Sequence, residues 1–168
     1  LAISLASEFS LGLISVDASQ VYRGLNIGTA KPAPAVLKKY PHALVDIRDP
    51  EDAFSAGAFC KESVREVHRI VAKRQIPTLV GGTMFYFAAL SAGLDRLPSA
   101  DAQFRHDIEA EAQQLGWPAL YERLERLDPE AAQRIHHNDH QRIQRALEIY
   151  DQTRPTLSGS APEQPRLP

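Results

Sequence analysis

Cysteine is nearly absent from this sequence, and long apolar runs are absent altogether. Cys60 is the only cysteine among 168 residues, so no disulfide can form within the chain. No apolar run approaches the ~18 residues of a membrane span. Residues 1–16 also lack the basic segment and cleavage site of a signal peptide. We therefore expect a cytoplasmic protein that makes no contact with a membrane.

The chain also lacks an excess of positive charge. Its formal net charge is −2, from 19 Lys and Arg against 21 Asp and Glu. Nucleic-acid-binding proteins usually carry a basic surface because they contact phosphates, so the overall charge argues weakly against RNA. A local strip of Arg side chains remains compatible with this charge, since acids elsewhere cancel the sum. The 43% hydrophobic content is typical of a soluble globular protein.

The spacing of apolar residues predicts an α/β first half. Short apolar runs that end abruptly at polar residues or glycines are typical of buried parallel strands. The predicted strands are 11–16, 43–47 and 76–80. The predicted helices of this half are 1–9, 32–40 and one that begins after Ser55. A strand, a helix and a further strand in this order predict a right-handed parallel crossover.

The helix after Ser55 is expected to be amphipathic. Its apolar stripe consists of Cys60, Val64, Val67, Ile70 and Val71. The charged residues of this helix lie largely off that stripe, so we expect them to face solvent. They are Lys61, Arg65, Glu66 and Arg69.

The second half is predicted to be helical. Its expected helices cover residues 101–115, 118–127, 128–135 and 139–153. Beyond residue 153 the sequence has four prolines and no periodicity, which predicts a loop or tail. We therefore divide the chain into an α/β core over 1–94, a helical region over 95–152 and a tail over 153–168.

Asp17 is the first candidate for chemistry. It comes directly after the strand predicted over 11–16, and ligands of open α/β sheets bind outside the carboxyl ends of the strands. The alternative is a structural acid that caps a turn or the next helix. The strand pattern alone leaves both interpretations open.

Five separated segments carry a family resemblance. They are residues 13–32, 41–50 (PHALVDIRDP), 76–87 (IPTLVGGTMFYF), 97–101 (LPSAD) and 135–149 (IHHNDHQRIQRALEI). In this order and at roughly this spacing they closely resemble the tRNA dimethylallyltransferases, which modify an adenine beside the anticodon. The resemblance implies a P-loop-NTPase-like parallel sheet core of the α/β class with a helical region. It also implies two substrates, the anticodon stem-loop of tRNA and dimethylallyl diphosphate, and we expect a monomer.

The resemblance implies catalytic roles for Asp17 and Thr83. In the family the acid at the position of Asp17 takes the proton from the exocyclic amine of the target adenine. An aryl amine is a poor nucleophile, so a carboxylate within hydrogen-bond reach helps by stabilising the positive charge that grows on it. Thr83 follows two glycines at the start of a helical run, where N–H groups favour an anion. Without the resemblance, Gly81-Gly82-Thr83 would be interpreted as a tight turn.

A larger set of residues is implied to contact tRNA. It comprises Asp17, Ala18, Ser19, Gln20, Thr83, Phe104, Gln141, Arg142, Ile143, Gln144 and Arg145. Gln20 is expected to read a base edge through its amide. Gln141 and Arg145 lie one helical turn apart and share a face directed away from the apolar stripe. The alternatives are ordinary turn residues for Ser19 and Gln20, and a solvated charged face for the arginines.

Two other clusters permit a functional and a structural interpretation. Phe85, Tyr86 and Phe87 either line a prenyl channel or pack in the core, and packing is favoured because aromatic side chains are usually buried. The segment 136–140 contains three histidines and an aspartate, which suggests a metal site. No cysteine or histidine partner has a recognised spacing, so we expect no metal site there. The family usually has prolines at the positions of His137 and His140, which favours local variation in a turn.

The family's Walker A loop, Gly-x-x-x-x-Gly-Lys-[Ser/Thr], would precede Leu1 and is not in this sequence. That loop and Mg²⁺ would neutralise the leaving diphosphate, so we expect Mg²⁺ as a cofactor that comes with the loop. The chain is therefore either a part of a longer protein or a truncated product that binds tRNA without catalysis. A third interpretation is a small-molecule P-loop transferase, such as a nucleotide kinase or an adenylate prenyltransferase.

Overall fold

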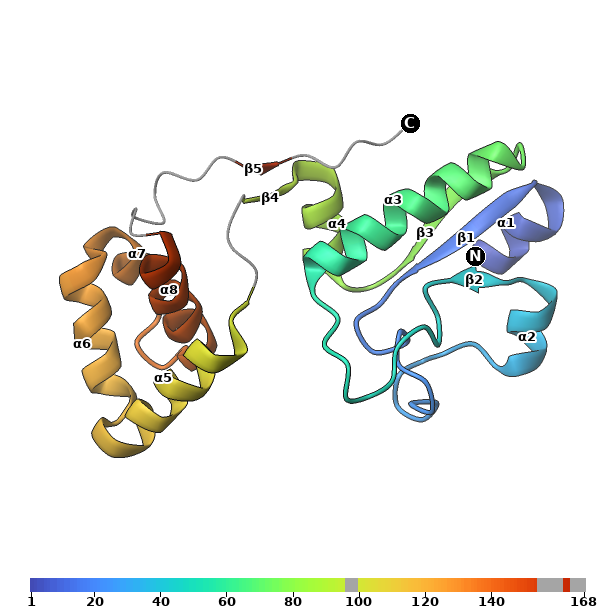
Figure 1. Cartoon of the computed structure of the whole chain (residues 1–168). Helices are drawn as coiled ribbons and strands as arrows, with labels where there is room; N and C mark the ends of the chain where they lie inside the picture. The colour runs from blue at the N-terminus through green and yellow to red at the C-terminus, as the bar shows by residue number, and fades with distance from the viewer. Residues whose placement is uncertain (96–99, 154–161, 164–168) are drawn as a thin grey trace. The chain divides into compact units, whose positions relative to one another are not determined.

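The structure, a computed structural model, describes residues 1–95, 100–153 and 162–163. The chain divides into two compact units, one built on Leu1–Leu94 and the other on Asp95–Pro162 (Figure 1). Each unit has its own hydrophobic core.

The first unit contains a three-stranded parallel sheet. Its strands are β1 (Leu11–Val16), β2 (His42–Ala43) and β3 (Ile76–Gly81), in the order β2-β1-β3. The central strand β1 pairs in parallel with both neighbours, and its register with β3 runs from Leu11 opposite Ile76 to Val16 opposite Gly81. The last four residues of β1 are buried. The predicted parallel strands at 11–16 and 76–80 are therefore confirmed, but only β1 is buried: β3 is partly exposed throughout, and Ile76 is 60% exposed.

The predicted strand over 43–47 is wrong in length. Only His42 and Ala43 pair with β1, because the backbone turns away immediately afterwards. Leu44 and Asp46 have φ angles of 65° and 56°, in the left-handed region that side chains with a Cβ rarely adopt. Such a backbone cannot continue a strand. Leu44 is nevertheless buried in the core.

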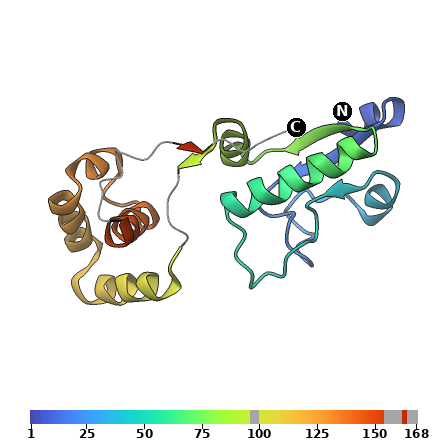
Figure 2. The ribbon, with the colours of Figure 1, turned by 45° about the horizontal axis from the view of Figure 1, so that its top comes forward.

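The first unit also contains four helices. They are α1 (Ala2–Glu8), α2 (Pro34–Lys39), α3 (Ala56–Ala72) and α4 (Met84–Ala92). Helix α3 lies along one face of the sheet (Figures 1 and 2). A Cβ on Gly12 would lie 2.4 Å from Cγ2 of Ile70, so the glycine in β1 permits the close approach of this helix.

The Ser55 cap is confirmed, and the buried stripe of α3 is corrected. The Ser55 hydroxyl accepts a hydrogen bond from the Ala58 N–H, as an N-cap does. The fully buried side chains of α3 are Phe59, Ser63, Val67 and Ile70. Val71 is 46% exposed and Phe59 is buried, so the face of α3 that packs on the core includes Phe59 and leaves out Val71, unlike the expected stripe.

The second unit is helical, as predicted. It contains α5 (Ala102–Leu115), α6 (Trp117–Leu127), α7 (Pro129–Arg134) and α8 (His140–Thr153). The carboxylates of Asp101 and Asp128 accept hydrogen bonds from the first-turn N–H groups of α5 and α7. The core of this unit consists of Ile108, Leu120, Leu124, Ala132, Ile143, Ala146 and Leu147.

The described residues also contain two very short strands. They are β4 (Leu94–Asp95) and β5 (Pro162–Glu163). The rest of the predicted tail, and most of the segment LPSAD, lie outside the described residues. No helix in the described part of the chain has the length and apolar character needed to cross a membrane.

Candidate functional site

The carboxyl ends of β1 and β3 bring the two predicted catalytic residues to one place. Val16 and Gly81 are paired in the sheet, so Asp17 and Thr83 both follow the same edge. The Ala18 N–H donates to Oγ1 of Thr83 over 3.1 Å, and the Thr83 N–H donates to the Val16 carbonyl over 3.1 Å. Thr83 occupies the N-cap position of α4 without capping it through its side chain. Its hydroxyl is instead bonded to the chain beside Asp17.

The carboxylate of Asp17 is held by the loop that follows it. Its Oδ1 accepts hydrogen bonds from the N–H groups of Ser19 (2.8 Å) and Gln20 (3.0 Å). Within the described residues no hydrogen bond reaches Oδ2. Asp17 itself is partly exposed. One oxygen therefore fixes the orientation of the carboxylate, and the other is available to accept a proton.

The side chain of Gln20 forms hydrogen bonds within the same loop. Its Oε1 accepts from the Ser15 hydroxyl over 3.1 Å, and its Nε2 donates to the carbonyls of Thr29 and Ala30, each over 3.2 Å. The amide thus ties the start of the loop to its end. This geometry favours a role in positioning the loop, and contact with a base edge stays a prediction.

Lys31 is a second tie in this loop, and sequence reasoning did not single it out. Its side chain is 3% exposed and its Nζ lies 2.6 Å from Oδ1 of Asp46. The same Nζ donates to the Tyr22 carbonyl (2.7 Å) and to Oδ1 of Asn26 (3.2 Å). A lysine in a polar loop is usually exposed, so the sequence carries no signal for this burial. Lys31 holds the segment after Asp17 against the segment after β2.

Replacing Lys31 with methionine is expected to loosen this loop. Methionine keeps the apolar stem and loses all three polar contacts, so we expect a loss of about 1–3 kcal/mol in the free energy of unfolding. Amide hydrogen exchange over residues 18–31 should become faster. Lys38→Met, on an exposed position of α2, is the matched control and should leave exchange in this loop unchanged. Unchanged exchange in Lys31→Met would contradict the role assigned to the ammonium group.

The aromatic residues after Thr83 divide between core and surface. Tyr86 is 5% exposed, stacks on Phe59 with ring centroids 4.4 Å apart, and donates its hydroxyl to the Phe54 carbonyl. Burial, with a smaller contribution from the nearby Tyr22 and Asp17, raises the pKa of Tyr86. Phe87 also packs against this core, whereas Phe85 is 65% exposed. Core packing is thus the observed role of Tyr86 and Phe87.

The predicted tRNA-binding residues of α8 have different surroundings. Gln141 and Arg142 are exposed, and Arg142 pairs with Asp139 over 2.9 Å. Gln144 donates to the carbonyl of Arg105 on α5. Ile143 is fully buried in the core of the helical unit, so its side chain is not available to RNA. On α5, Phe104 is partly buried against the same core.

Arg145 is held by a buried carboxylate. The Glu148 side chain is 0% exposed, and its Oε2 accepts from Arg145 (2.6 Å) and from Arg105 (3.2 Å). Its Oε1 accepts from the Asp101 N–H. Burial by itself raises the pKa of Glu148, but the bonds from Arg145, the Asp101 N–H and Arg105 outweigh it and lower that pKa. Glu148 was not among the predicted site residues.

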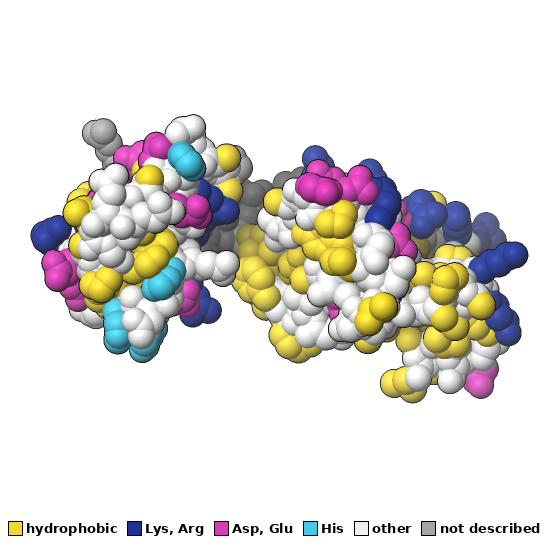
Figure 3. All heavy atoms as spheres, turned by 90° about the horizontal axis from the view of Figure 1, so that it is seen from below, with side chains coloured by type: hydrophobic (Ala, Val, Ile, Leu, Met, Phe, Trp, Pro, Cys, Tyr) yellow, Lys and Arg dark blue, Asp and Glu magenta, His cyan; other side chains and the backbone are white. Residues whose placement is uncertain are grey.

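The histidine segment forms ring contacts. His140 stacks on Trp117 with ring centroids 4.5 Å apart, and His136 stacks on His137 at 4.3 Å. Histidine side chains are visible on the surface of the helical unit in Figure 3. Within the described part of the chain, no group of three His, Cys, Asp or Glu residues is placed to hold a metal ion.

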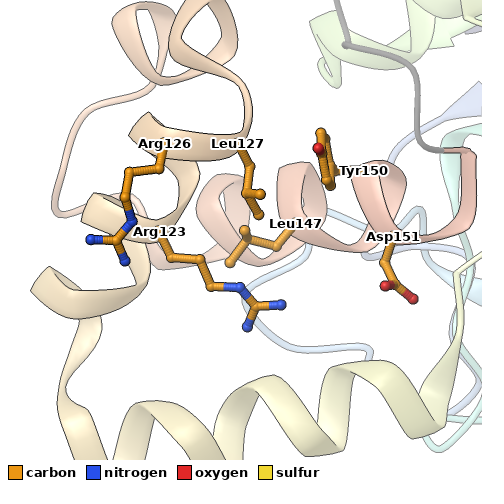
Figure 4. A pocket seen from close by; sticks show the side chains of 6 residues that line it. All are labelled: Arg123, Arg126, Leu127, Leu147, Tyr150 and Asp151. Atoms are coloured by element: carbon orange, nitrogen blue, oxygen red, sulfur yellow. The ribbon is translucent and has the colours of Figure 1, made fainter.

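The helical unit also has a pocket outside the predicted site. It has a volume of about 400 Å³ and opens between α6 and α8 (Figure 4). The guanidinium of Arg123 beside it already pairs with Glu111 over 2.7 Å. The residues that line the pocket are Arg123, Arg126, Leu127, Leu147, Tyr150 and Asp151.

Comparison with known proteins identifies the family of this chain. A family model described as IPP transferase matches residues 20–168. The chain belongs to the IPP transferase family. It is 51% identical over 158 residues to tRNA dimethylallyltransferase 2 of Hahella chejuensis, covering 94% of this chain and 48% of the relative. It is 49% identical over 166 residues to a tRNA dimethylallyltransferase of Thiobacillus denitrificans, covering 99% and 53%. The chain thus spans about half the length of the curated relatives it matches.

Solved structures of IPP transferases share the fold. The tRNA isopentenylpyrophosphate transferase of Bacillus halodurans matches with a TM-score of 0.55 and 38% identity, over 95% of this chain and 51% of that one. A eukaryotic dimethylallyltransferase whose structure shows it acting on tRNA matches with a TM-score of 0.73 and 28% identity, over 94% and 39%. The resemblance and the P-loop-NTPase-like α/β fold predicted from the sequence are confirmed.

Proposed function

We propose that this protein transfers a dimethylallyl group from dimethylallyl diphosphate to N6 of the adenine that follows the anticodon in tRNA on its 3′ side. The main support is the position of the Asp17 carboxylate, which is held through one oxygen beside Thr83 where β1 and β3 end. The second support is that the chain belongs to the IPP transferase family. This edge of a parallel sheet is where α/β proteins bind their ligands.

In the proposed reaction Asp17 is the general base. The adenine N6 attacks the first carbon of the dimethylallyl group, a C–N bond forms, and the C–O bond to diphosphate breaks. The carboxylate takes the proton that N6 loses, and Oδ2 is suitable because Oδ1 is already bonded to the loop. The hydroxyl of Thr83 accepts from the Ala18 N–H and has its own proton to donate toward the reacting centre. The base must leave its stack to reach this position.

The diphosphate needs positive charge that the described residues supply only in part. The turn from Gly81 to Thr83 leads into α4, whose first N–H groups favour an anion. Near this turn Asp17 is the carboxylate that the described residues could provide to a metal ion. No group of three His, Cys, Asp or Glu among the described residues is placed to hold one. We therefore assign Mg²⁺, which stabilises charge on a departing diphosphate, to the Walker A segment expected from the resemblance. None of the steps assigned to Asp17 and Thr83 depends on it.

The proposed tRNA contacts come from both units. In the first unit they are Ala18, Ser19 and Gln20, which follow Asp17 directly. In the helical unit they are Phe104, Gln141, Arg142, Gln144 and Arg145. Guanidinium groups suit phosphates because they donate two parallel hydrogen bonds. We propose that a monomer binds the anticodon stem-loop through these residues.

The proposed function is tested by identifying the product of the reaction. The full-length protein is incubated with dimethylallyl diphosphate and either tRNA or AMP, and the products are analysed by mass spectrometry. We expect tRNA, after digestion to nucleosides, to contain an adenosine heavier by one dimethylallyl group, and AMP to be unchanged. Modification of AMP with no change in tRNA would identify a small-molecule transferase instead.

A further inference from the structure

We propose that Asp46 is a positioning residue, which holds the Asp17 carboxylate in the orientation that proton transfer needs. It acts through two contacts, an ion pair with Lys31 and a backbone hydrogen bond to Gln20. The inference rests on the proposed function in taking Asp17 as the base. It goes further because neither the strand pattern nor the family resemblance gave Asp46 a role at the site.

Asp46 and Asp17 are linked through the backbone of one residue, Gln20. The Gln20 N–H donates to Oδ1 of Asp17 over 3.0 Å, and the Gln20 carbonyl accepts from the Asp46 N–H over 3.1 Å. The next carbonyl along the chain, that of Val21, accepts from the two N–H groups that follow Asp46, over 2.9 and 3.0 Å. The backbone after Asp17 is therefore held on the segment that begins at Asp46.

The side chain of Asp46 contacts the other end of the same loop. Its Oδ1 lies 2.6 Å from Nζ of Lys31, whose side chain is 3% exposed. The carbonyl of Ala30, the residue before Lys31, accepts from Nε2 of Gln20 over 3.2 Å. The contacts therefore form a closed ring: Asp46 holds the backbone of Gln20 directly, and it holds the Gln20 side chain through the segment that ends at Lys31.

The backbone angles at this junction support a functional role. Among the described residues, the non-glycine residues with positive φ are Ala30 (51°), Leu44 (65°), Asp46 (56°) and Arg74 (57°). Three of these four belong to the two segments that the ion pair joins, and one of the three directly precedes Lys31. Left-handed backbone is unfavourable for residues with a Cβ, and it is found mainly where function requires a particular geometry. Its concentration here indicates an arrangement that serves the neighbouring site.

The opposing interpretation is that these contacts serve only the stability of the first unit. Asp46→Gly separates the two interpretations, because it removes the carboxylate while glycine adopts a φ of 56° freely. In a single-turnover measurement the rate constant reports the geometry of the site, and the amplitude reports the fraction of folded protein. A stability role predicts a lower amplitude with an unchanged rate constant. The positioning role predicts a rate constant lower by about 10–50-fold with a nearly unchanged Kd for tRNA.

Rescue by a conservative variant and a double variant test the path from Asp46. In Asp46→Asn the amide oxygen can still accept from Lys31, and asparagine tolerates positive φ, so we expect a rate constant within about 3-fold of that of the parent. Lys31→Met should slow the single turnover at least as much as Asp46→Gly does. The double variant should match Lys31→Met alone, because both changes break the same ion pair. Multiplication of the two effects would contradict the proposed path.

Asp49→Gly is the matched control. Asp49 also pairs with the loop after Asp17, through Arg23 over 2.9 Å, but the Arg23 and Asp49 side chains are 52% and 59% exposed. Exposed ion pairs contribute little, so we expect the rate constant and Kd of this variant to equal those of the parent.

All variants are measured in the full-length protein with saturating dimethylallyl diphosphate and tRNA. A folded Asp46→Gly variant with the rate constant of the parent overturns the inference and leaves the proposed function intact. If Asp46→Gly does not fold, Lys31→Met decides, and a rate constant equal to that of the parent again overturns the inference. A parent protein that does not prenylate tRNA contradicts the proposed function itself.

Discussion

Asp17→Asn is expected to slow prenyl transfer by about 10²–10⁴-fold and to leave tRNA affinity nearly unchanged. The asparagine oxygen can still accept hydrogen bonds from the Ser19 and Gln20 N–H groups, so the loop keeps its geometry. The amide cannot take up the proton that the adenine N6 loses. The loss should therefore fall on turnover and not on binding.

Single-turnover rates and equilibrium binding of tRNA separate these two effects. The measurement uses the full-length protein with saturating dimethylallyl diphosphate. Asp52→Asn makes the same chemical change at an exposed position of the same unit and should match the parent in both measurements. Equal single-turnover rates for Asp17→Asn and the parent would remove Asp17 from the mechanism.

The placement of Asp17 and Thr83 was predictable because it depends on strand pattern and parallel topology. An apolar run that ends at Asp17, and another that ends at two glycines before Thr83, identify two strand ends. In a parallel sheet such ends meet at one edge. The observed pairing of Val16 with Gly81 puts both residues there. The Ser55 cap was predictable for a similar reason, since it depends on neighbouring residues only.

Features that depend on backbone angles or on distant partners were not predictable. The run from Ala43 to Ile47 looks like a strand, but Leu44 and Asp46 adopt positive φ and end it. Positive φ is rare outside glycine, asparagine and aspartate, so a leucine at position 44 does not indicate that the strand ends there. The side chains of Lys31 and Glu148 are both buried although charged residues are usually exposed, because each forms ion pairs that the local sequence pattern does not show.

The largest expected effect on stability is that of Gly81→Ala. A Cβ at Gly81 would lie 2.1 Å from the Val16 carbonyl oxygen and 2.5 Å from its carbon, far inside van der Waals contact. These are backbone atoms of the central strand, so no side-chain rotation relieves the clash. The β1 to β3 pairing would have to separate at the edge that Asp17 and Thr83 follow. We expect the free energy of unfolding to fall by about 3 kcal/mol or more, at the upper end for overpacking.

Gly82→Ala is the control that isolates this cause. It is the neighbouring residue with the same chemical change, yet a Cβ there meets no atom within 4 Å. Urea unfolding of both variants should therefore give a midpoint far below the parent for Gly81→Ala and one close to the parent for Gly82→Ala. Equal midpoints for the two variants would show that the close approach of β3 to Val16 does not constrain this edge. Because Asp17 and Thr83 follow directly from these strand ends, the same approach also sets the distance between the two proposed catalytic groups.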